Sequence, residues 1–335
     1  MDPGSAAQRF ALRCARDTAN AMLNFLARRI VQLIPTLFFV SILIFSLQQL
    51  LPGDPALVMA GEERDPAVIE QIRKQYHLDQ PIPVQYVYWV KGVLSGDFGE
   101  SLRVKAPVLD LIKQKLPVTL QLGSMAIVIA FLIGIPAGIV SAVKKGTAWD
   151  YGANLFALWG ISTPNFWLGI MLIFLFSIKL GWLPASGYVP LSENWHASLA
   201  STIMPAFVLG NAIAAILMRH TRSAMLQVLQ SDYVRTARAK GLGTTAVLFR
   251  HAFRNALIPV ITILGLQFGT LLAGTIVTET IFSWPGIGRL TVQAISSRDY
   301  PLLQGCILVI SISYVLVNLF TDLLYSFIDP RVRLA

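Results

Sequence analysis

The sequence predicts an all-α integral membrane protein that crosses the bilayer with six transmembrane helices. Hydrophobic residues make up 55% of its 335 residues and charged residues only 13%. Soluble domains carry about 25% charged residues. The apolar residues are clustered into six stretches, each close to the roughly 20 residues that a helix needs to cross the hydrocarbon core. The predicted spans are residues 30–51, 118–143, 153–178, 199–218, 257–278 and 302–326.

The distribution of positive charge predicts the orientation of these spans. Lys and Arg gather in loops that face the cytoplasm. Basic residues outnumber acidic ones in the N-terminal segment 1–29, in the loop after the second span, in the loop 219–255 and in the tail 327–335. Acidic residues balance them in the segment 52–117 and in the turn 279–301. Both termini are therefore predicted to be cytoplasmic, with residues 52–117 as an external cap.

The N-terminal segment contributes little to this prediction. Residues 1–21 are polar and lack the apolar run of a secretory signal peptide. Met22 begins a run that is typical of a natural start. Residues 1–21 are therefore interpreted as an extension or a tag remnant and are set aside.

Breaks and caps predict the elements between the spans. A Leu-Pro-Gly-Asp-Pro run ends the first span, because prolines and glycine stop a helix. In the external cap, residues 67–76 are predicted to form a short helix capped by Asp65. Residues 85–93, which include three aromatic side chains, are predicted to form an interfacial helix. In the second span, Gly134 and Gly138 have the spacing that lets two helices pack closely.

Polar residues in or beside the spans are candidates for the wall or gate of a conduit. Pro164 lies among polar side chains in the third span, and a proline there frees backbone groups that neighbouring protein or water must satisfy. Glu279 follows the fifth span, where the alternative is an interfacial carboxylate. The run Trp284-Pro285-Gly286 predicts a turn, either at an outer gate or purely structural. The candidate pore or gate residues are Ser162, Thr163, Asn165, Gln267, Glu279 and Trp284.

The sequence contains no motif for covalent chemistry. A phosphate-binding loop, a zinc-protease motif, a nucleophile elbow and paired cysteines are all absent, and the four histidines are scattered. The chain is therefore predicted to be no enzyme and to hold no metal. The spans also lack the buried charges of an ion-coupled carrier. The net charge of +9 follows the topology and does not indicate nucleic-acid binding. A passive channel or a transporter energised by a partner remains.

The loop 219–255 favours the energised transporter. Its centre, residues 232–243, reads DYVRTARAKGLG, a short helix that the two glycines end. Small side chains alternate there with cations, so the helix is suited to a partner's groove with an acidic rim. The alternative is an interfacial helix that rests on anionic lipid. The candidate coupling residues are Arg235, Thr236, Ala237, Arg238, Ala239, Lys240 and Gly241.

This loop resembles the coupling loop of permeases in binding-protein-dependent ABC importers. The family's Glu-Ala-Ala is replaced here by Thr236-Ala237-Arg238-Ala239, a departure associated with the peptide and nickel branch, which includes dipeptide, oligopeptide and glutathione systems. Other motifs of that branch are Leu51-Pro-Gly-Asp-Pro55, Gly96-Asp-Phe-Gly-Glu-Ser101, Arg254-Asn-Ala-Leu-Ile-Pro259, Glu279-Thr-Ile-Phe-Ser-Trp-Pro-Gly-Ile-Gly-Arg289 and Asp329-Pro-Arg331.

The resemblance implies a type I permease fold in the bacterial cytoplasmic (inner) membrane, surrounded by lipid. It implies three kinds of protein partner: a second homologous permease, two ATPase subunits that hold ATP and Mg²⁺, and an extracytoplasmic substrate-binding protein. The chain itself would bind no cofactor. The implied cargo is a dipeptide, an oligopeptide or glutathione, with nickel chelates and glycosides as alternatives. A stand-alone channel, a secondary carrier and a membrane scaffold are the competing functions.

Overall fold

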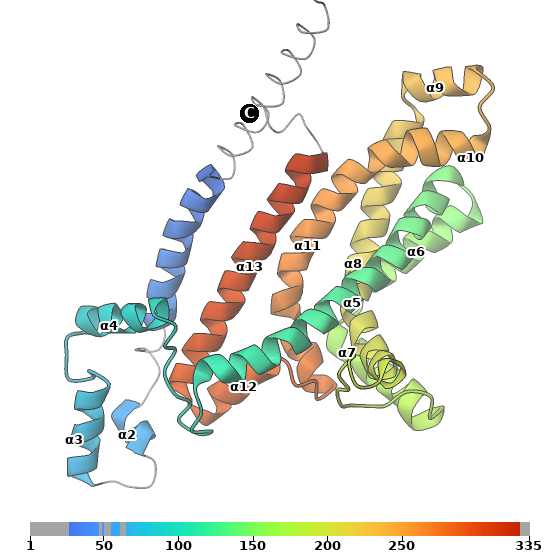
Figure 1. Ribbon diagram of the computed structural model, residues 1–335. Helices are drawn as coiled ribbons and strands as arrows, with labels where there is room; N and C mark the ends of the chain where they lie inside the picture. Colours follow the sequence, from blue (N-terminus) through green and yellow to red (C-terminus); the bar gives the residue numbers. More distant parts are fainter. Residues whose placement is uncertain (1–26, 47–48, 50–54, 61–64, 329–335) are drawn as a thin grey trace, which may run out of the picture.

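The computed structural model describes residues 27–46, 49, 55–60 and 65–328. This part of the chain is helical, and its only β-type pairing is an isolated bridge between Glu100 and Pro107. In Figure 1, α9 (Asp232–Ala239) lies at one end of the molecule, and α12 (Ile287–Ser297) lies toward the other. These two ends are called the α9 end and the α12 end below.

The first helix is Ala27–Ser46. The elements that follow it are α2 (Pro55–Ala60), α3 (Pro66–Gln75), α4 (Ile82–Leu94), α5 (Val108–Val143), α6 (Ala148–Ser162), α7 (Asn165–Leu172), the π-helical η1 (Ile173–Lys179), α8 (Trp195–Leu229), α9 (Asp232–Ala239), α10 (Thr244–Ala246), the π-helical η2 (Val247–Phe253), α11 (Arg254–Ile281), α12 (Ile287–Ser297) and α13 (Tyr300–Ile328).

The predicted all-helical membrane fold is confirmed. In the described residues, four helices are long and apolar enough to cross a bilayer: the first helix, α5, α8 and α13. Two bent helix pairs raise the number to six when each pair is counted as one span. One pair is α6 with α7 and η1, and the other runs through residues 244–267.

The structure divides the predicted third span, residues 153–178, into two parts. Helix α6 ends at Ser162 and α7 begins at Asn165, and the two parts meet at 104°. Pro164 lies at the bend, where its missing N–H and its ring prevent a continuous helix. Hydropathy alone did not reveal the bend, because both arms are apolar.

Two helices extend beyond the spans that hydropathy predicts. Helix α5 begins ten residues before residue 118, and α8 runs eleven residues past residue 218. The added turns carry charged residues such as Lys113 and Arg222. A charge-free stretch marks the part of a helix that tolerates lipid, whereas the helix itself continues into the polar layer.

Close packing of α5 on α8 forms the centre of the protein. A Cβ atom on Gly134 would lie 2.6 Å from the carbonyl oxygen of Ala214, and one on Gly138 would lie 2.6 Å from Cβ of Thr221. Gly210, which lies on α8, likewise leaves space for the backbone of α5. Small residues let helix backbones approach each other in this way. The predicted packing role of Gly134 and Gly138 is therefore confirmed.

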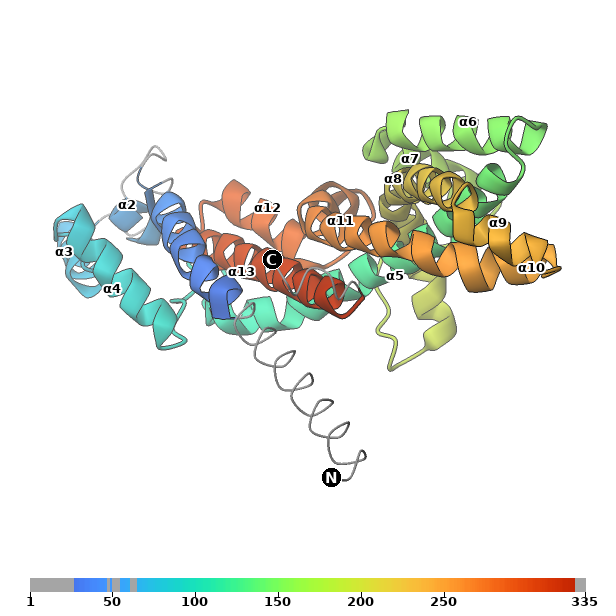
Figure 2. The ribbon, with the colours of Figure 1, turned by 90° about the horizontal axis from the view of Figure 1, so that it is seen from above.

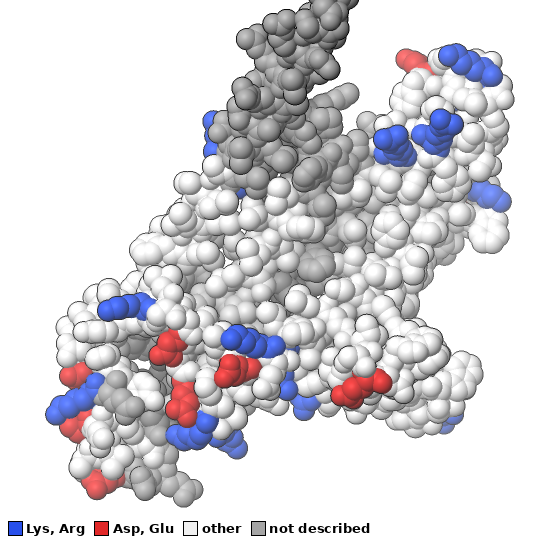
Figure 3. Space-filling view, viewed as in Figure 1, with Lys and Arg blue, Asp and Glu red and all other residues white. Residues whose placement is uncertain are grey.

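Charge is separated along the molecule. Figure 3 shows a broad uncharged band between two charged ends. On this face the α9 end is mostly basic, while the α12 end carries both signs.

The view from above shows α3 and α4 at one side of the molecule and α6 at the opposite side (Figure 2). The exposed large apolar side chains of the helices form the kind of surface that faces lipid or another apolar protein.

Candidate functional site

Helix α9 projects from the α9 end of the protein (Figure 1). It ends in a Schellman motif, the helix stop in which a left-handed residue closes two backbone bonds. The N–H of Gly241 bonds to the carbonyl of Arg238 at 2.9 Å, and the N–H of Leu242 bonds to the carbonyl of Ala237 at 3.3 Å. Gly241 has a φ of +77°, which glycine adopts without strain. The predicted helix end at the glycine pair is confirmed.

Most of the predicted coupling residues lie on the outer surface of α9. Exposed positions are Arg235, Thr236, Arg238, Ala239, Lys240 and Gly241. Ala237 is the exception. It is 6% exposed and packs with Val234 and Val247 under the helix. The structure therefore does not offer Ala237 to a partner, since one face of a short helix must cover its own support.

The start of α9 and its connection to α11 depend on the residues around Asp232 and Tyr233. Ser231 occupies the N-cap position, and Asp232 lies in the first turn, where its charge favours the helix dipole. The ion pair of Asp232 with Arg235, at 3.5 Å, is almost fully exposed and contributes little. Asn255 of α11 donates to the hydroxyl of Tyr233 at 2.9 Å and so connects α9 to α11.

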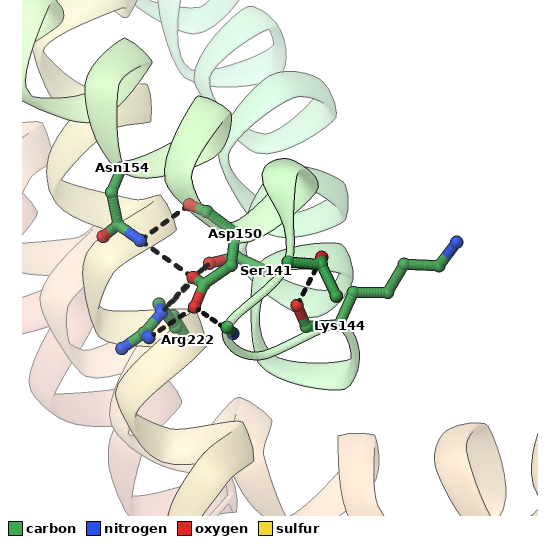
Figure 4. Close-up of polar contacts among 7 residues, drawn as sticks. Ser141, Lys144, Asp150, Asn154 and Arg222 are labelled. Atoms are coloured by element: carbon green, nitrogen blue, oxygen red, sulfur yellow. Dashed lines mark hydrogen bonds and ion pairs between the residues drawn. The ribbon is translucent and has the colours of Figure 1, made fainter.

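A buried ion pair lies near the same end of the protein (Figure 4). Arg222 of α8 reaches both carboxylate oxygens of Asp150 on α6, at 2.8 and 3.0 Å. Ser141 of α5 and the backbone N–H of Gly146 also donate to this carboxylate. Asn154 donates to it at 2.8 Å. The cluster joins α5, α6 and α8 at one point.

At the α12 end, a second buried carboxylate holds the start of α12. Glu279 is 0% exposed, although it was expected in an external turn, because α11 continues to Ile281. Its Oε1 accepts from the hydroxyl of Thr119 at 2.7 Å, and its Oε2 accepts from the N–H of Arg289 at 2.8 Å. Thr119 in turn accepts from the N–H of Ile287 at 2.8 Å. The first N–H groups of a helix lack internal partners, so this network satisfies them.

Trp284 lies in the turn between α11 and α12 and is 0% exposed. Its indole N–H donates to the carbonyl of Val118 at 3.2 Å. The ring packs edge-on against Tyr188, with centroids 4.9 Å apart. The Tyr188 hydroxyl donates to Gln121 at 3.1 Å. Burial, followed by the charge of Glu193, raises the pKa of Tyr188, so its hydroxyl keeps the donated proton well into the alkaline range.

The other pore candidates are dispersed. Ser162, Thr163 and Asn165 lie around the bend between α6 and α7. The hydroxyl of Thr163 donates a hydrogen bond to the carbonyl of Trp159 at 2.7 Å. Gln267 is half-buried in the middle of α11. The structure thus brings Glu279 and Trp284 together and leaves the remaining candidates apart.

Sequence reasoning missed Thr119, Tyr188, Asp150 and Arg222. Asp150 and Arg222 were counted only as loop charges. The sequence did carry a signal for their ion pair, because one is acidic, the other is basic, and both lie close to apolar spans. Thr119 and Tyr188 carried no signal, because their partners lie far away in the sequence. Within the described residues, no group of three or more His, Cys, Asp or Glu side chains lies close enough to hold a metal ion.

These features describe an all-helical membrane protein, and comparison with known proteins specifies its class. The chain belongs to the family of binding-protein-dependent transport system inner membrane components. The profile of that family matches residues 134–334, and the profile of its N-terminal part matches residues 22–123. The fold is also similar to a chain of the inward-facing MetNI methionine ABC transporter, with a TM-score of 0.54 at 15% identity. That alignment covers 65% of this chain and 96% of the other.

Curated relatives are similar over nearly their whole length. The dipeptide transport system permease protein DppB of Alkalihalophilus pseudofirmus is 44% identical over 93% of this chain and 100% of its own. The glutathione transport system permease protein GsiC of Escherichia coli is 45% identical over 93% and 99%, respectively. The di/tripeptide permease DppB of Pseudomonas aeruginosa is 45% identical over the same shares. The chain is therefore a permease of the ABC importer type.

Proposed function

We propose that this permease imports peptides, with dipeptides, tripeptides and glutathione as the cargo class. The observation that carries this proposal is its similarity to three peptide or glutathione permeases over 93% of the chain. The permease forms half of the translocation pore, and a second homologous permease supplies the other half. It performs no catalysis and binds no cofactor, while ATP and Mg²⁺ are bound by two partner ATPase subunits.

Uptake into proteoliposomes tests the cargo. The permease is reconstituted with its partner permease, its ATPase subunits and its binding protein, and uptake of labelled dipeptide, glutathione, nickel chelate and glycoside is measured with and without ATP. We expect ATP-dependent uptake of the peptides only. Uptake confined to a nickel chelate or a glycoside would contradict the cargo class. Uptake without ATP would favour a stand-alone channel or a secondary carrier.

Helix α9 is the proposed contact with the ATPase. Its projection from the protein and its exposed cations, Arg235, Arg238 and Lys240, support this role. A partner groove with an acidic rim fits this surface, because opposite charges guide the association of proteins. Gly241 and Ala239 add the small side chains that a close approach requires. Ala237 contributes indirectly, by holding α9 on Val247.

Charge removal tests this contact. The triple variant R235Q/R238Q/K240Q should retain the permease fold but lose most of the ATPase that co-purifies with it. The matched control, K144Q/K145Q/R219Q, removes three exposed cations from other positions near the same end. Equal retention of ATPase by both variants would contradict the proposed role of α9. Equal loss from both would reduce the contact to nonspecific charge attraction.

The α9 end is proposed to be cytoplasmic and the α12 end external, in a bacterial inner membrane. The basic character of the α9 end supports this orientation. The N-terminal end of the first helix and the C-terminal end of α13 lie toward the same end as α9 (Figure 1). Both termini are therefore proposed to be cytoplasmic. The segment that contains α2, α3 and α4, within 52–117, lies at the α12 end and is the proposed docking surface for the binding protein.

A further inference from the structure

Helix α5 has one weak position near the α12 end. Pro117 lies inside the helix and has no N–H, so the carbonyl one turn earlier lacks its helical partner. Long helices bend most readily at such a residue. The first turns of α5, from Val108 to Ile112, pack on α12 and α13 in one apolar cluster with Ile287. The remainder of α5, from Val118 onward, packs on α8.

The start of α12 is fastened to α5 immediately after this proline. Val118 accepts the indole N–H of Trp284, and Thr119 bonds both Glu279 and the N–H of Ile287. Helix α12 therefore contacts α5 on both sides of Pro117, with an apolar contact before the proline and a polar one after it. A contact of this kind fixes the angle between the two parts.

The local sequence preserves space for the Glu279 carboxylate. A Cβ atom on Gly286 would collide with Oε1 of Glu279 and with the hydroxyl of Thr119. A Cβ atom on Gly288 would lie 3.0 Å from Oε2 of Glu279 and 2.9 Å from Cα of Ile276. The two glycines thus admit a carboxylate to the N-terminal end of α12, where N–H groups and the helix dipole favour negative charge.

We propose that Glu279 and Thr119 form a positioning pair that sets the angle of α5 at Pro117. In doing so they hold α12 at the external mouth of the pore, an assignment that rests on the proposed function. The carboxylate accepts on both oxygens, from the Thr119 hydroxyl and from the N–H of Arg289. In Glu279→Gln, an NH₂ group replaces one oxygen, so the bond donated by the Thr119 hydroxyl or the one donated by Arg289 is lost.

A distance between two spin labels reports a change in this angle. Leu132 on α5 and Ile295 on α12 are 64% and 57% exposed, so labels at both sites leave the core intact. The assembled importer carries Thr119→Val, Thr119→Ser or Glu279→Gln, and the distance between the labels is measured. The matched control is Thr221→Val, because Thr221 is also 0% exposed, and its hydroxyl bonds to no group in the described part of the chain.

We expect T119V and E279Q to broaden the distance distribution at least twofold and to lower uptake per ATP hydrolysed by about tenfold. T119S, which retains the hydroxyl, should restore both values, and T221V should match wild type. A T119V variant that matches T221V in both readouts overturns the proposal. Failure of T119V to assemble also overturns it, because the contact would then serve folding alone. Absence of peptide uptake in wild type would refute the proposed function, while the distances would still test the pair.

Discussion

Asp150 on α6 and Arg222 on α8 form a two-pronged ion pair, with N–O distances of 2.8 and 3.0 Å. The Asp150 side chain is only 6% exposed, and Arg222 is 26% exposed. Ser141 adds a third helix, because its hydroxyl donates to the same carboxylate. The pair holds α5, α6 and α8 together near the helix that is proposed to contact the ATPase.

Breaking this pair should destabilise the protein strongly. Asp150→Ala leaves the Arg222 guanidinium and the Ser141 hydroxyl without their shared acceptor. Removing one partner of a fully buried pair costs about 3–5 kcal/mol, and the cost here should lie at or below the lower end of that range, because Arg222 is 26% exposed and can be hydrated. We expect a lower midpoint of thermal unfolding for the detergent-solubilised permease, measured by the loss of the monodisperse peak on size exclusion.

The exposed pair between Asp232 and Arg235 is the matched control for this prediction. Asp232→Ala removes a carboxylate that is 96% exposed, and surface pairs contribute about 0–1 kcal/mol. Its unfolding midpoint should stay close to that of wild type. Equal effects of the two substitutions would mean that the Asp150 pair contributes no more than a surface pair.

Gly241→Ala should loosen the end of α9. Its φ of +77° lies in the left-handed region, and no atom lies within 4 Å of the added Cβ, so the cost is backbone strain alone, about 1 kcal/mol. Gly243→Ala is the control, because Gly243 has an ordinary φ of −61° and equal open space. Hydrogen exchange of residues 232–240 should accelerate about fivefold in the first variant only. Faster exchange in both would assign the effect to the loop as a whole.

Gly138→Ala should separate α5 from α8. The added Cβ would lie 2.6 Å from Cβ of Thr221 and 2.7 Å from the carbonyl oxygen of Met218. Overpacking of this kind costs about 1–3 kcal/mol. Gly123→Ala, on the same helix, meets no atom within 4 Å and should be neutral or slightly stabilising. Thermal unfolding compares the two, and an unchanged midpoint for G138A would show that the helices can shift without cost.

The Tyr188 hydroxyl should create an alkaline limit to stability. Its pKa is raised above the ordinary value of about 10, so the stability it contributes is fully present below pH 10 and is lost as the pH rises through the raised pKa. Tyr188→Phe removes the titrating group and its bond to Gln121. The stability difference between wild type and this variant should shrink at alkaline pH. The exposed Tyr151→Phe serves as the control, and a difference independent of pH would contradict the prediction.

Local signals in the sequence predicted local structure well. The side chain of Asp65 caps α3 by accepting from the N–H of Ala67 at 2.9 Å, as its position before a helical run indicates. Gly241 ends α9 because glycine tolerates a positive φ. The apolar stretches were found because lipid imposes a simple rule of length.

Contacts between segments that are distant in the chain could not be predicted from the sequence. Thr119 and Glu279 are 160 residues apart, and neither carries a local motif for the other. Glu279 was placed beyond the end of the fifth span, as a gate candidate or an interfacial carboxylate, because the charge-free stretch ends before it. The helix continues past it into a buried network, and burial of a carboxylate depends on donors that only the fold supplies. The inward face of Ala237 was missed because a helix of eight residues offers too few positions to define a face.

Helix α8 contains 35 residues, which at 1.5 Å per residue gives a length of about 52 Å, well beyond a hydrocarbon core of roughly 30 Å. At its first turns, Ser198 accepts from Gln121, the partner of Tyr188. Its last turns lead directly into α9. One continuous helix therefore joins the two candidate sites, so a displacement of α9 would travel along α8 and would meet a single internal proline, Pro205, before it reached the α12 end.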